Sequence, residues 1–452
     1  MEIINGYISG AIVPISIVLF SIYFLIKLKG RPFVGINIML HSIFDKNDRK
    51  GDSGIRAVIF ALAGTLGVGN IVGVASAIAL GGAGSVFWMW VSAFLAMILK
   101  YSEVVLALLH RRKRKDEYFG GAMYYMKDCF ASRNKRGIGA IFVCVFTVFC
   151  LINGFTMGGI IQSNAISESI KMIFNMNGRV VGLILAIICT VVFLFNGKCI
   201  FSLCEKLVPF VSILYLLMSF AVIIINRKSL PFVFGDIIND AFSFEAAGGG
   251  AMGFLISKSL RYGTIRGLFS NEAGCGTSPI AHATARTDEP VKQGMLGVVE
   301  VFIDTIVVCT MTAFVILINK EVSIIHSENP ILMVFDSFSF VLGSASNILL
   351  TVCVCLFAFA TIVCWGYYGK ECIYYFNKGK TAEKVYYCVY ILTIYFGAFM
   401  DLYYVWELAD LAVGVMTVMN LFTLYMLRNE IKNATEGYYK KSPQKRALKI
   451  KQ

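Results

Sequence analysis

The stretch Gly-Thr-Leu-Gly-Val-Gly-Asn at residues 64–70 interrupts the second long apolar segment of the chain. A membrane interior holds no water for free backbone N–H and C=O groups, so a membrane helix is interrupted only where it lines a buried or wet site. The half-helix ends then present N–H groups on one side and C=O groups on the other, which is how many transporters hold small zwitterions and cations. The stretch therefore predicts a polytopic membrane protein with a small-molecule site at this break.

The composition of the whole chain agrees with a membrane protein. Of 452 residues, 57% are hydrophobic and only 15% are charged, and the mean hydropathy is +0.72. Apolar runs of about 20 residues, each able to cross a hydrocarbon core of about 30 Å as a helix, account for these values. We predict an all-α polytopic membrane protein folded as a single membrane domain over 1–452. Its eleven expected membrane-spanning helices are 7–26, 55–82, 84–109, 138–170, 179–196, 207–226, 251–285, 293–318, 343–369, 384–401 and 405–427.

The net charge of +13 reflects topology rather than nucleic-acid binding. Of the 41 Lys and Arg residues, 32 lie in the loops that follow the odd-numbered spans. Cytoplasmic loops carry such an excess of basic residues. We therefore expect a multi-pass protein of the cell membrane with its N-terminus outside and its C-terminus in the cytoplasm.

A second glycine-rich stretch, Gly-Cys-Gly-Thr at 274–277, resembles Gly-Val-Gly-Asn at 67–70. Spans 2–6 and 7–11 then form two five-helix units of opposite orientation, because span 2 starts inside and span 7 starts outside. Broken helices in matching positions indicate a midplane site between inverted repeats. We expect an extra N-terminal helix in 1–30, the repeats in 55–226 and 251–427, and a basic cytoplasmic tail in 428–452.

The break in the seventh span has two candidate positions, 248–250 and 270–276. We prefer the second, because the first would leave the nearly uncharged residues 267–285 as a cytoplasmic loop. About ten residues up to Arg286 then form the inner half-helix. Arg266 lies on the outer half-helix, where it must face a water-filled vestibule or a carboxylate partner.

The backbone of the first break offers groups of both polarities. The N–H groups of Val68 and Gly69 are expected to bind a carboxylate. The C=O groups of Ala63 and Leu66 can help ligate a hard cation, which prefers oxygen. Glycines in membrane helices also serve close packing alone, but here three of them alternate with polar side chains.

Two carboxylates lie inside predicted spans, where they are costly and are usually kept for function or an ion pair. Glu272 follows Asn271 near the second break, and it either pairs with a basic group or takes part in coupling. Asp304 of span 8 is a lone carboxylate in the run Val301-Phe-Ile-Asp-Thr-Ile306, and it is either a hydrogen-bonded structural group or a gating or proton-coupling group.

Four other polar or aromatic side chains occur within spans. Gln162 either bonds across helices or touches a ligand. Thr361 and Trp365 are four residues apart and share a helical face. We expect Thr361 to bind substrate or sodium and Trp365 to form a pocket wall, whereas His282 is expected to be a packing histidine.

Eight short motifs are spread along the chain between about residues 55 and 425. They are Gly67-Val-Gly-Asn-Ile-Val-Gly-Val-Ala75, Val86-Phe-Trp-Met-Trp90, Lys100-Tyr-Ser-Glu103, Arg266-Gly-Leu-Phe-Ser-Asn-Glu-Ala-Gly274, Pro279-Ile-Ala-His282, Gln293-Gly294, Phe302-Ile-Asp-Thr305 and Trp365-Gly-Tyr-Tyr-Gly369. In this order they resemble the alanine/glycine:cation symporter family of bacteria and archaea.

This resemblance implies a sodium- or proton-coupled importer of small amino acids. It also implies a fold of the leucine-transporter type with one extra N-terminal helix. The residues carried over to an amino-acid pocket are Val68, Gly69, Gln162, Phe269, Thr361 and Trp365, those carried over to a sodium site are Ala63, Leu66 and Thr361, and Asn70 and Ser270 would lie close to both.

The chain departs from the family pattern at four positions. Ala83, Ala122 and Met419 stand where the family has proline, and Ala360 stands where it usually has a hydroxyl residue. The last change leaves one oxygen fewer near the expected sodium site, so it bears on the choice of cation.

We predict a secondary active transporter that imports a small neutral amino acid, alanine or glycine, with sodium by alternating access. The alternatives are proton coupling on the same fold and a non-transporting amino-acid receptor. We expect no enzymatic activity and no cofactor besides sodium as the coupling ion, and we expect a monomer in the lipid bilayer. The expected substrate-binding residues are Thr65, Gly67, Val68, Gly69, Asn70, Gln162, Phe269, Ser270, Asn271, Thr361 and Trp365, the sodium ligands Ala63, Leu66 and Thr361, and the gating or coupling residues Arg266, Glu272 and Asp304.

Overall fold

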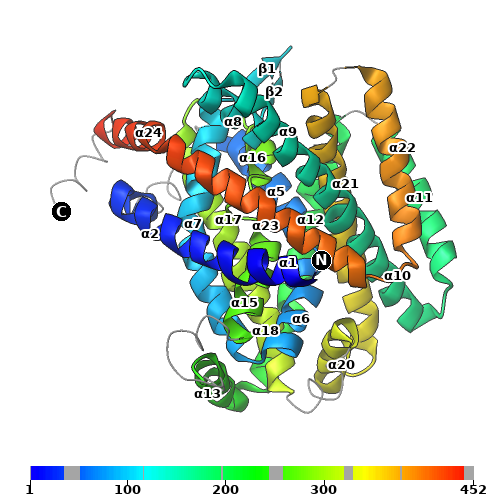
Figure 1. Cartoon of the computed structure of the whole chain (residues 1–452). Coiled ribbons are helices and arrows are strands. Elements are labelled where there is room, and N and C mark those ends of the chain that lie inside the picture. Colours follow the sequence, from blue (N-terminus) through cyan, green and yellow to red (C-terminus); the bar gives the residue numbers. More distant parts are fainter. Residues whose placement is uncertain are drawn as a thin grey trace.

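The structure is a computed structural model that describes residues 2–34, 51–115, 117–194, 197–243, 258–319, 329–376 and 379–441. This part of the chain is almost entirely helical, as predicted (Figure 1). The exception is an antiparallel hairpin of two short strands, β1 (Arg112–Arg114) and β2 (Glu117–Phe119), which projects at one end of the molecule.

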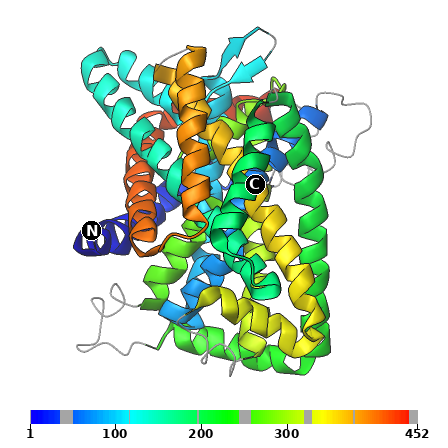
Figure 2. The ribbon, with the colours of Figure 1, turned by 90° about the vertical axis from the view of Figure 1, so that its right-hand side faces the viewer.

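Seven helices of the described residues are long and apolar enough to cross a membrane. An eighth candidate is a pair of helices bent by 65°, Gly54–Thr65 and Val68–Gly81. Most of these helices run along the long axis of the molecule (Figure 2). The seven are Asn5–Leu28 (within α1 Glu2–Tyr7, η1 Ile8–Ile12 and α2 Val13–Leu28), α7 (Gly84–Leu109), Arg136–Phe174 (α9 Arg136–Asn153, η3 Gly154–Ile160 and α10 Ile161–Phe174), Ile200–Ile225 (within α12 Gly197–Ile225), Pro290–Ile318 (α17 Pro290–Val301, η5 Phe302–Cys309 and α18 Thr310–Ile318), α21 (Ala345–Phe376) and α23 (Tyr403–Met426).

Three of the eleven expected spans form helices that do not meet the same criteria of length and composition. Helix α11 (Gly178–Leu194) has only 17 residues. Helix α22 (Lys380–Gly397) carries three charged residues in its first five positions, and α15 (Lys258–Asn271) carries three basic residues. Length and composition therefore identify seven or eight spans rather than eleven.

Several helices outside the expected spans complete the fold. Helix α8 (Ala122–Ala131) lies near the hairpin, whereas α13 (Leu230–Ala241) and α20 (Pro330–Leu342) lie at the opposite end of the molecule (Figure 1). The sequence predicts only a basic tail after residue 427, but its first part forms the helix α24 (Arg428–Lys441). Two short elements, α3 (Arg31–Val34) and η4 (Arg227–Ser229), lie between longer helices.

Local sequence accounts for where several helices start. Proline stands in the first turn of α13, α17 and α20, where its missing N–H would have no partner within the helix. Asn329 also caps α20, because its Oδ1 accepts a hydrogen bond from the Leu332 N–H at 3.4 Å. These local signals determine where a helix starts, but they do not determine which other helices it packs against.

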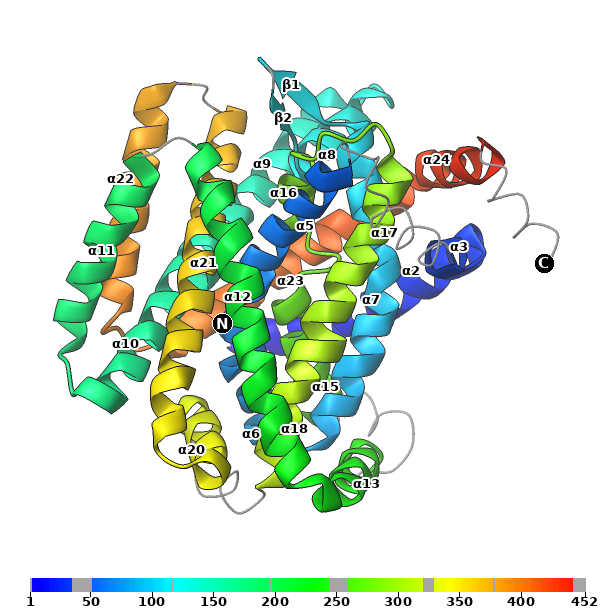
Figure 3. The same ribbon diagram turned by 180° about the vertical axis from the view of Figure 1, so that it is seen from behind.

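Helix α7 lies in the core, since 83% of its most apolar 18-residue window is buried. It packs against α15 and α17, and α17 is seen beside it from behind (Figure 3). The N-terminal helix crosses the outside of the bundle next to α23 (Figure 1). The Asn5 side chain anchors it there, because Nδ2 donates to Glu407 Oε2 at 2.6 Å. The two interrupted helices lie inside this frame.

Candidate functional site

The first interrupted helix consists of α5 (Gly51–Thr65), the short turn η2 (Val68–Asn70) and α6 (Val72–Gly81). The backbone of Gly67 is extended, and its N–H is held by Asn70 Oδ1 at 3.2 Å. A Cβ atom at Gly67 would lie 2.6 Å from Thr361 Oγ1 and 3.0 Å from Gln162 Oε1. Only glycine therefore allows the polar groups of α10 and α21 to approach the break this closely.

The second interrupted helix consists of α15 and α16 (Ser278–His282), and the break lies between them at 272–277. Glu272, Gly274 and Gly276 have φ angles of +52°, +89° and +82°. This agrees with the preferred position at 270–276, and the other candidate, 248–250, lies outside the described residues. The half-helix after the break is shorter than expected: α16 has only five residues, and turns follow it before Pro290.

Three oxygen atoms converge beside the first break. The hydroxyl of Thr361 donates to the Ala63 carbonyl at 3.0 Å and lies 3.5 Å from the Leu66 carbonyl. All three residues are buried, and so is Ala360. The expected sodium-site residues are therefore neighbours, although they come from segments nearly 300 residues apart.

The expected carboxylate-binding backbone faces Gln162. The Val68 N–H donates to Gln162 Oε1 at 3.1 Å, and Gln162 Nε2 donates to the Met157 carbonyl at 3.1 Å. A Cβ atom at Gly69 would lie 3.3 Å from the Phe269 ring. The break, α10 and α15 thus meet at this point.

Trp365 and Thr65 bring unsatisfied polar atoms into the same region. Trp365 is fully buried against Gly158 of η3. Its Nε1 and the hydroxyl of Thr65 have no hydrogen-bond partner among the described residues. Buried polar groups are normally paired, so these two atoms are candidates for ligand contacts.

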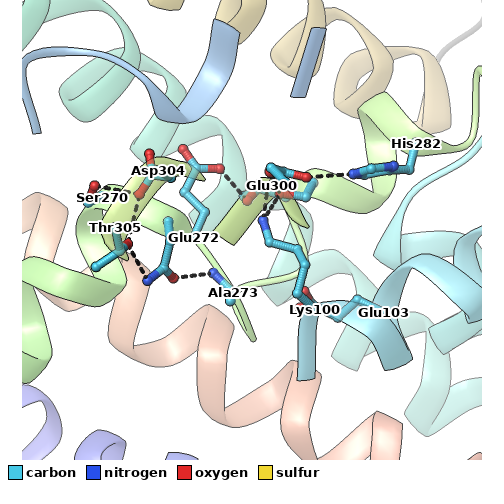
Figure 4. Close-up of polar contacts among 12 residues, drawn as sticks. Lys100, Glu103, Ser270, Glu272, Ala273, His282, Glu300, Asp304 and Thr305 are labelled. Atoms are coloured by element: carbon cyan, nitrogen blue, oxygen red, sulfur yellow. Dashed lines mark hydrogen bonds and ion pairs between the residues drawn. The ribbon is translucent and has the colours of Figure 1, made fainter. Parts of the chain in front are cut away.

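Asn70 connects the first break to the second interrupted helix and to η5. Its Nδ2 donates to Ser270 Oγ and to Asp304 Oδ1, both at 2.8 Å. Asp304 Oδ2 accepts from Ser270 at 2.7 Å and from Thr305 at 2.9 Å (Figure 4). Asn271 joins through Thr305, to which it donates at 3.1 Å. Thr305 was missed in the sequence, although it directly follows Asp304.

Asp304 is not the lone carboxylate that the sequence suggests, because Glu300 lies one turn before it on α17. Glu300 is buried and pairs with Lys100 of α7 at 3.0 Å. Glu272 forms no ion pair within the described residues, and its Oε2 accepts from Thr277 at 2.5 Å. Counting the charges inside the expected spans, Lys100 and Glu103 included, would have indicated this buried network.

Arg266 has a carboxylate partner, which was one of its two expected surroundings. Its guanidinium lies 3.1 Å from Asp410 and 4.5 Å from the centre of the Trp406 ring. Trp406 in turn contacts Phe269, with 5.0 Å between the ring centres. The side chains of these four residues thus form a packed cluster next to the two breaks.

A cleft with a volume of about 440 Å³ extends from exposed residues to the first break. It reaches from exposed Asp401 to buried Val68 and is lined in part by Trp406. No group of three or more His, Cys, Asp or Glu side chains that could hold a metal ion occurs in the described ranges.

The fold, with its candidate spans and its two interrupted helices, is that of an all-α polytopic membrane protein. The structure resembles that of a Na⁺-coupled sialic acid symporter, with a TM-score of 0.57 at 12% identity over 90% of this chain and 87% of that one. The model of the sodium:alanine symporter family matches residues 1–452, and the chain belongs to this family. It is a multi-pass membrane transporter and not an enzyme.

Named relatives agree with this membership. The sodium/alanine symporter AgcS of Methanococcus maripaludis is 32% identical over 442 residues, which is 96% of both chains. An uncharacterized transporter of Haemophilus influenzae is 37% identical over 405 residues, 88% of this chain and 86% of the relative. The amino-acid carrier protein AlsT of Bacillus subtilis is 33% identical over 397 residues, 87% of this chain and 82% of the relative.

Proposed function

We propose that the chain imports a small neutral amino acid, alanine or glycine, together with sodium by alternating access. One observation carries this proposal: the carbonyls of Ala63 and Leu66 lie 3.0 and 3.5 Å from the hydroxyl of Thr361. Uncharged oxygens in a buried cluster suit a hard monovalent cation. Membership of a family that includes a sodium/alanine symporter supports the same cation and substrate.

The substrate carboxylate would bind the N–H groups of Val68 and Gly69. In the structure Gln162 Oε1 accepts from the Val68 N–H. A substrate carboxylate would replace Gln162 Oε1 as the acceptor of the Val68 N–H, so the Gln162 side chain would have to move away from this N–H. The walls of the proposed pocket are Thr65, Gly67, Asn70, Phe269, Ser270, Asn271, Thr361 and Trp365.

The proposed pocket suits a small side chain. Trp365 and Phe269 are almost fully buried, and Gly67 and Gly158 leave no room for a Cβ atom. Arg266 with Asp410 would close access from the cleft, and Glu272 and Asp304 would couple the two broken helices to the bound cation.

The proposed frame is a leucine-transporter-type inverted repeat of eleven spans. Its units are an extra helix in 1–30, repeats in 55–226 and 251–427, and a cytoplasmic tail in 428–452. The distribution of basic loops supports an outside N-terminus. The end that carries α8, the hairpin and α24 would then face the cytoplasm.

Proton coupling is the second candidate, and Ala360 favours it. Without a hydroxyl at this position, the proposed sodium site lacks one oxygen of the family pattern. Asp304 is a fully buried carboxylate in contact with both broken helices through Asn70 and Ser270, so it offers a place for a proton.

A pair of measurements tests the proposal. Purified protein is heated with each of a panel of amino acids in sodium or in potassium, because a ligand that binds the folded state raises the unfolding temperature. Uptake of labelled alanine and glycine into proteoliposomes is then measured with and without a sodium gradient. Stabilisation and uptake that require sodium support the proposal, and equal uptake without sodium refutes sodium coupling.

A further inference from the structure

A buried polar cluster lies at the opposite end of the broken helices from Arg266 and Asp410. It comprises Lys100, Glu300, His282 and Gln293, whose exposed fractions are all between 0% and 1%. Figure 4 shows Lys100 and His282 pointing toward Glu300 from different sides. The proposed transport mechanism uses none of these side chains.

The hydrogen bonds of Gln293 fix the orientation of its amide and the tautomer of His282. Gln293 Nε2 lies 3.1 Å from the Gly54 carbonyl, which can only accept, so the nitrogen must face it. The same nitrogen lies 3.0 Å from His282 Nδ1, which must therefore accept as well. His282 then carries its proton on Nε2 and donates to Glu300 Oε2 at 2.7 Å.

The resulting chain of bonds joins one half of each broken helix, and these two halves lie toward the same end of the molecule. Gly54 belongs to α5, which precedes the first break, and His282 belongs to α16, which follows the second. Gln293 and Glu300 belong to α17, and Lys100 of α7 anchors the chain by pairing with Glu300 at 3.0 Å. Figure 1 shows α5 and α16 toward the hairpin end, and α6 and α15 toward the other end.

The contact between α5 and α17 is unusually close at Gly54. A Cβ atom on Gly54 would lie 2.8 Å from Gln293 Oε1, so the amide rests directly on the backbone of α5. Any swing of α5 away from α17 must break this contact and the hydrogen bond to the Gly54 carbonyl.

We propose that Gln293 and His282 are positioning residues. Their hydrogen bonds to each other, to the Gly54 carbonyl and to Glu300, here called the latch, hold α5 and α16 against α7 and α17 and so keep the substrate site closed toward the hairpin end. This proposal rests on the proposed transport by alternating access. Release of the latch frees α5 to open the path toward that end, and reformation closes it.

A native cysteine reports on the latch. Cys364 of α21 is fully buried, and its Sγ donates to the Phe60 carbonyl of α5 at 3.3 Å. Movement of α5 exposes this thiol, whereas Cys189 is equally buried in α11, which packs mainly against α22 and α10. Site-resolved thiol labelling, read by peptide mass spectrometry, therefore separates movement of α5 from general loosening.

The test compares the unsubstituted protein with three single-residue variants in proteoliposomes. Gln293→Leu removes both hydrogen bonds, and Gly54→Ala pushes the amide away by its new Cβ. Asn319→Leu is the control, because it breaks a similar amide-to-carbonyl bond, to Ser337 at 2.9 Å, between α18 and α20. Loss of one net hydrogen bond shifts an equilibrium about three- to tenfold.

We expect Gln293→Leu and Gly54→Ala to raise Cys364 labelling by about three- to tenfold, with Cys189 unchanged. Asn319→Leu should change neither rate. Unchanged Cys364 labelling in both latch variants, or an equal rise at Cys189, overturns the latch. Absence of sodium-dependent alanine uptake in the unmodified protein overturns the proposed function instead, so the two failures are distinct.

Discussion

Replacing Thr361 by valine tests the proposed sodium site most directly. The substitution keeps the shape of the side chain but removes the hydroxyl that lies 3.0 Å from the Ala63 carbonyl and 3.5 Å from the Leu66 carbonyl. Because both carbonyls belong to the interrupted backbone, they stay in place when the hydroxyl is lost. The expected effect is therefore specific to the cation.

The magnitude follows from the kind of interaction that is lost. A polar contact to a charged group contributes about 1.5–3 kcal/mol, and a neutral hydrogen bond contributes about 1 kcal/mol. Since about 1.4 kcal/mol corresponds to a tenfold change, Thr361→Val should weaken sodium binding roughly 10- to 100-fold. The unfolding temperature in potassium should fall only slightly.

The assay is alanine uptake into proteoliposomes as a function of external sodium, combined with thermal unfolding in sodium and in potassium. Thr361→Ser is the matched control, because it keeps Oγ and should keep the sodium dependence. A half-saturating sodium concentration that Thr361→Val leaves unchanged would refute the assignment of Thr361 to a sodium site.

Three further predictions concern the surroundings of the site. Ala360→Ser adds an oxygen beside the proposed sodium site and should lower the half-saturating sodium concentration on the order of threefold, whereas a rise in the same uptake assay would contradict this role. Arg266→Gln leaves the carboxylate of Asp410 unpaired, so it should unfold at a lower temperature than the double variant with Asp410→Asn, and equal or reversed unfolding temperatures would contradict the pairing. Burial lowers the pKa of His110, but its hydrogen bonds to Asp128 of α8 and to a glutamate of α24 raise that pKa overall. His110, at the end of α7, thus bridges α8 and α24. This bridge should be fully stabilised below about pH 6.5 and weaken as the pH rises through the raised pKa. Proteolysis of α24 that is independent of pH, or equally dependent on it in His110→Gln, would be inconsistent with this.

The two breaks could be predicted from the sequence because their signals are local. Glycines and polar residues inside an apolar run report on the backbone itself, as at 64–70 and 270–276. The convergence of Thr361 on Ala63 and Leu66 was expected only through the family resemblance, since spacing along one chain does not say which helices meet.

The partners within the buried charge network could not be predicted, because pairing is a tertiary property. Lys100 and Glu300 lie 200 residues apart, and each alone looks like a costly charge within a span. His282 was expected to be a packing histidine with satisfied hydrogen bonds, and it is buried with its two ring nitrogens bonded to Glu300 and Gln293. The identity of these two partners follows only from the packing of the helices. The helices α13 and α20 escaped prediction because they are too short for a span and lie in segments that the topology treats as loops.

The π-helical turns η3 and η5 let the helices of the site differ by one residue in length without turning the pocket side chains. Each π-turn holds one residue more than an α-helical turn would. Deleting one residue from η3 would let this turn close as a regular α-helical turn and leave the two sides of the helix in nearly the same orientation, whereas the same deletion within a regular α-helix would rotate its two sides against each other by about 100°. Gln162, two residues beyond η3, would therefore keep its direction toward Val68. A single-residue gap in an alignment at such a turn is thus compatible with an unchanged pocket.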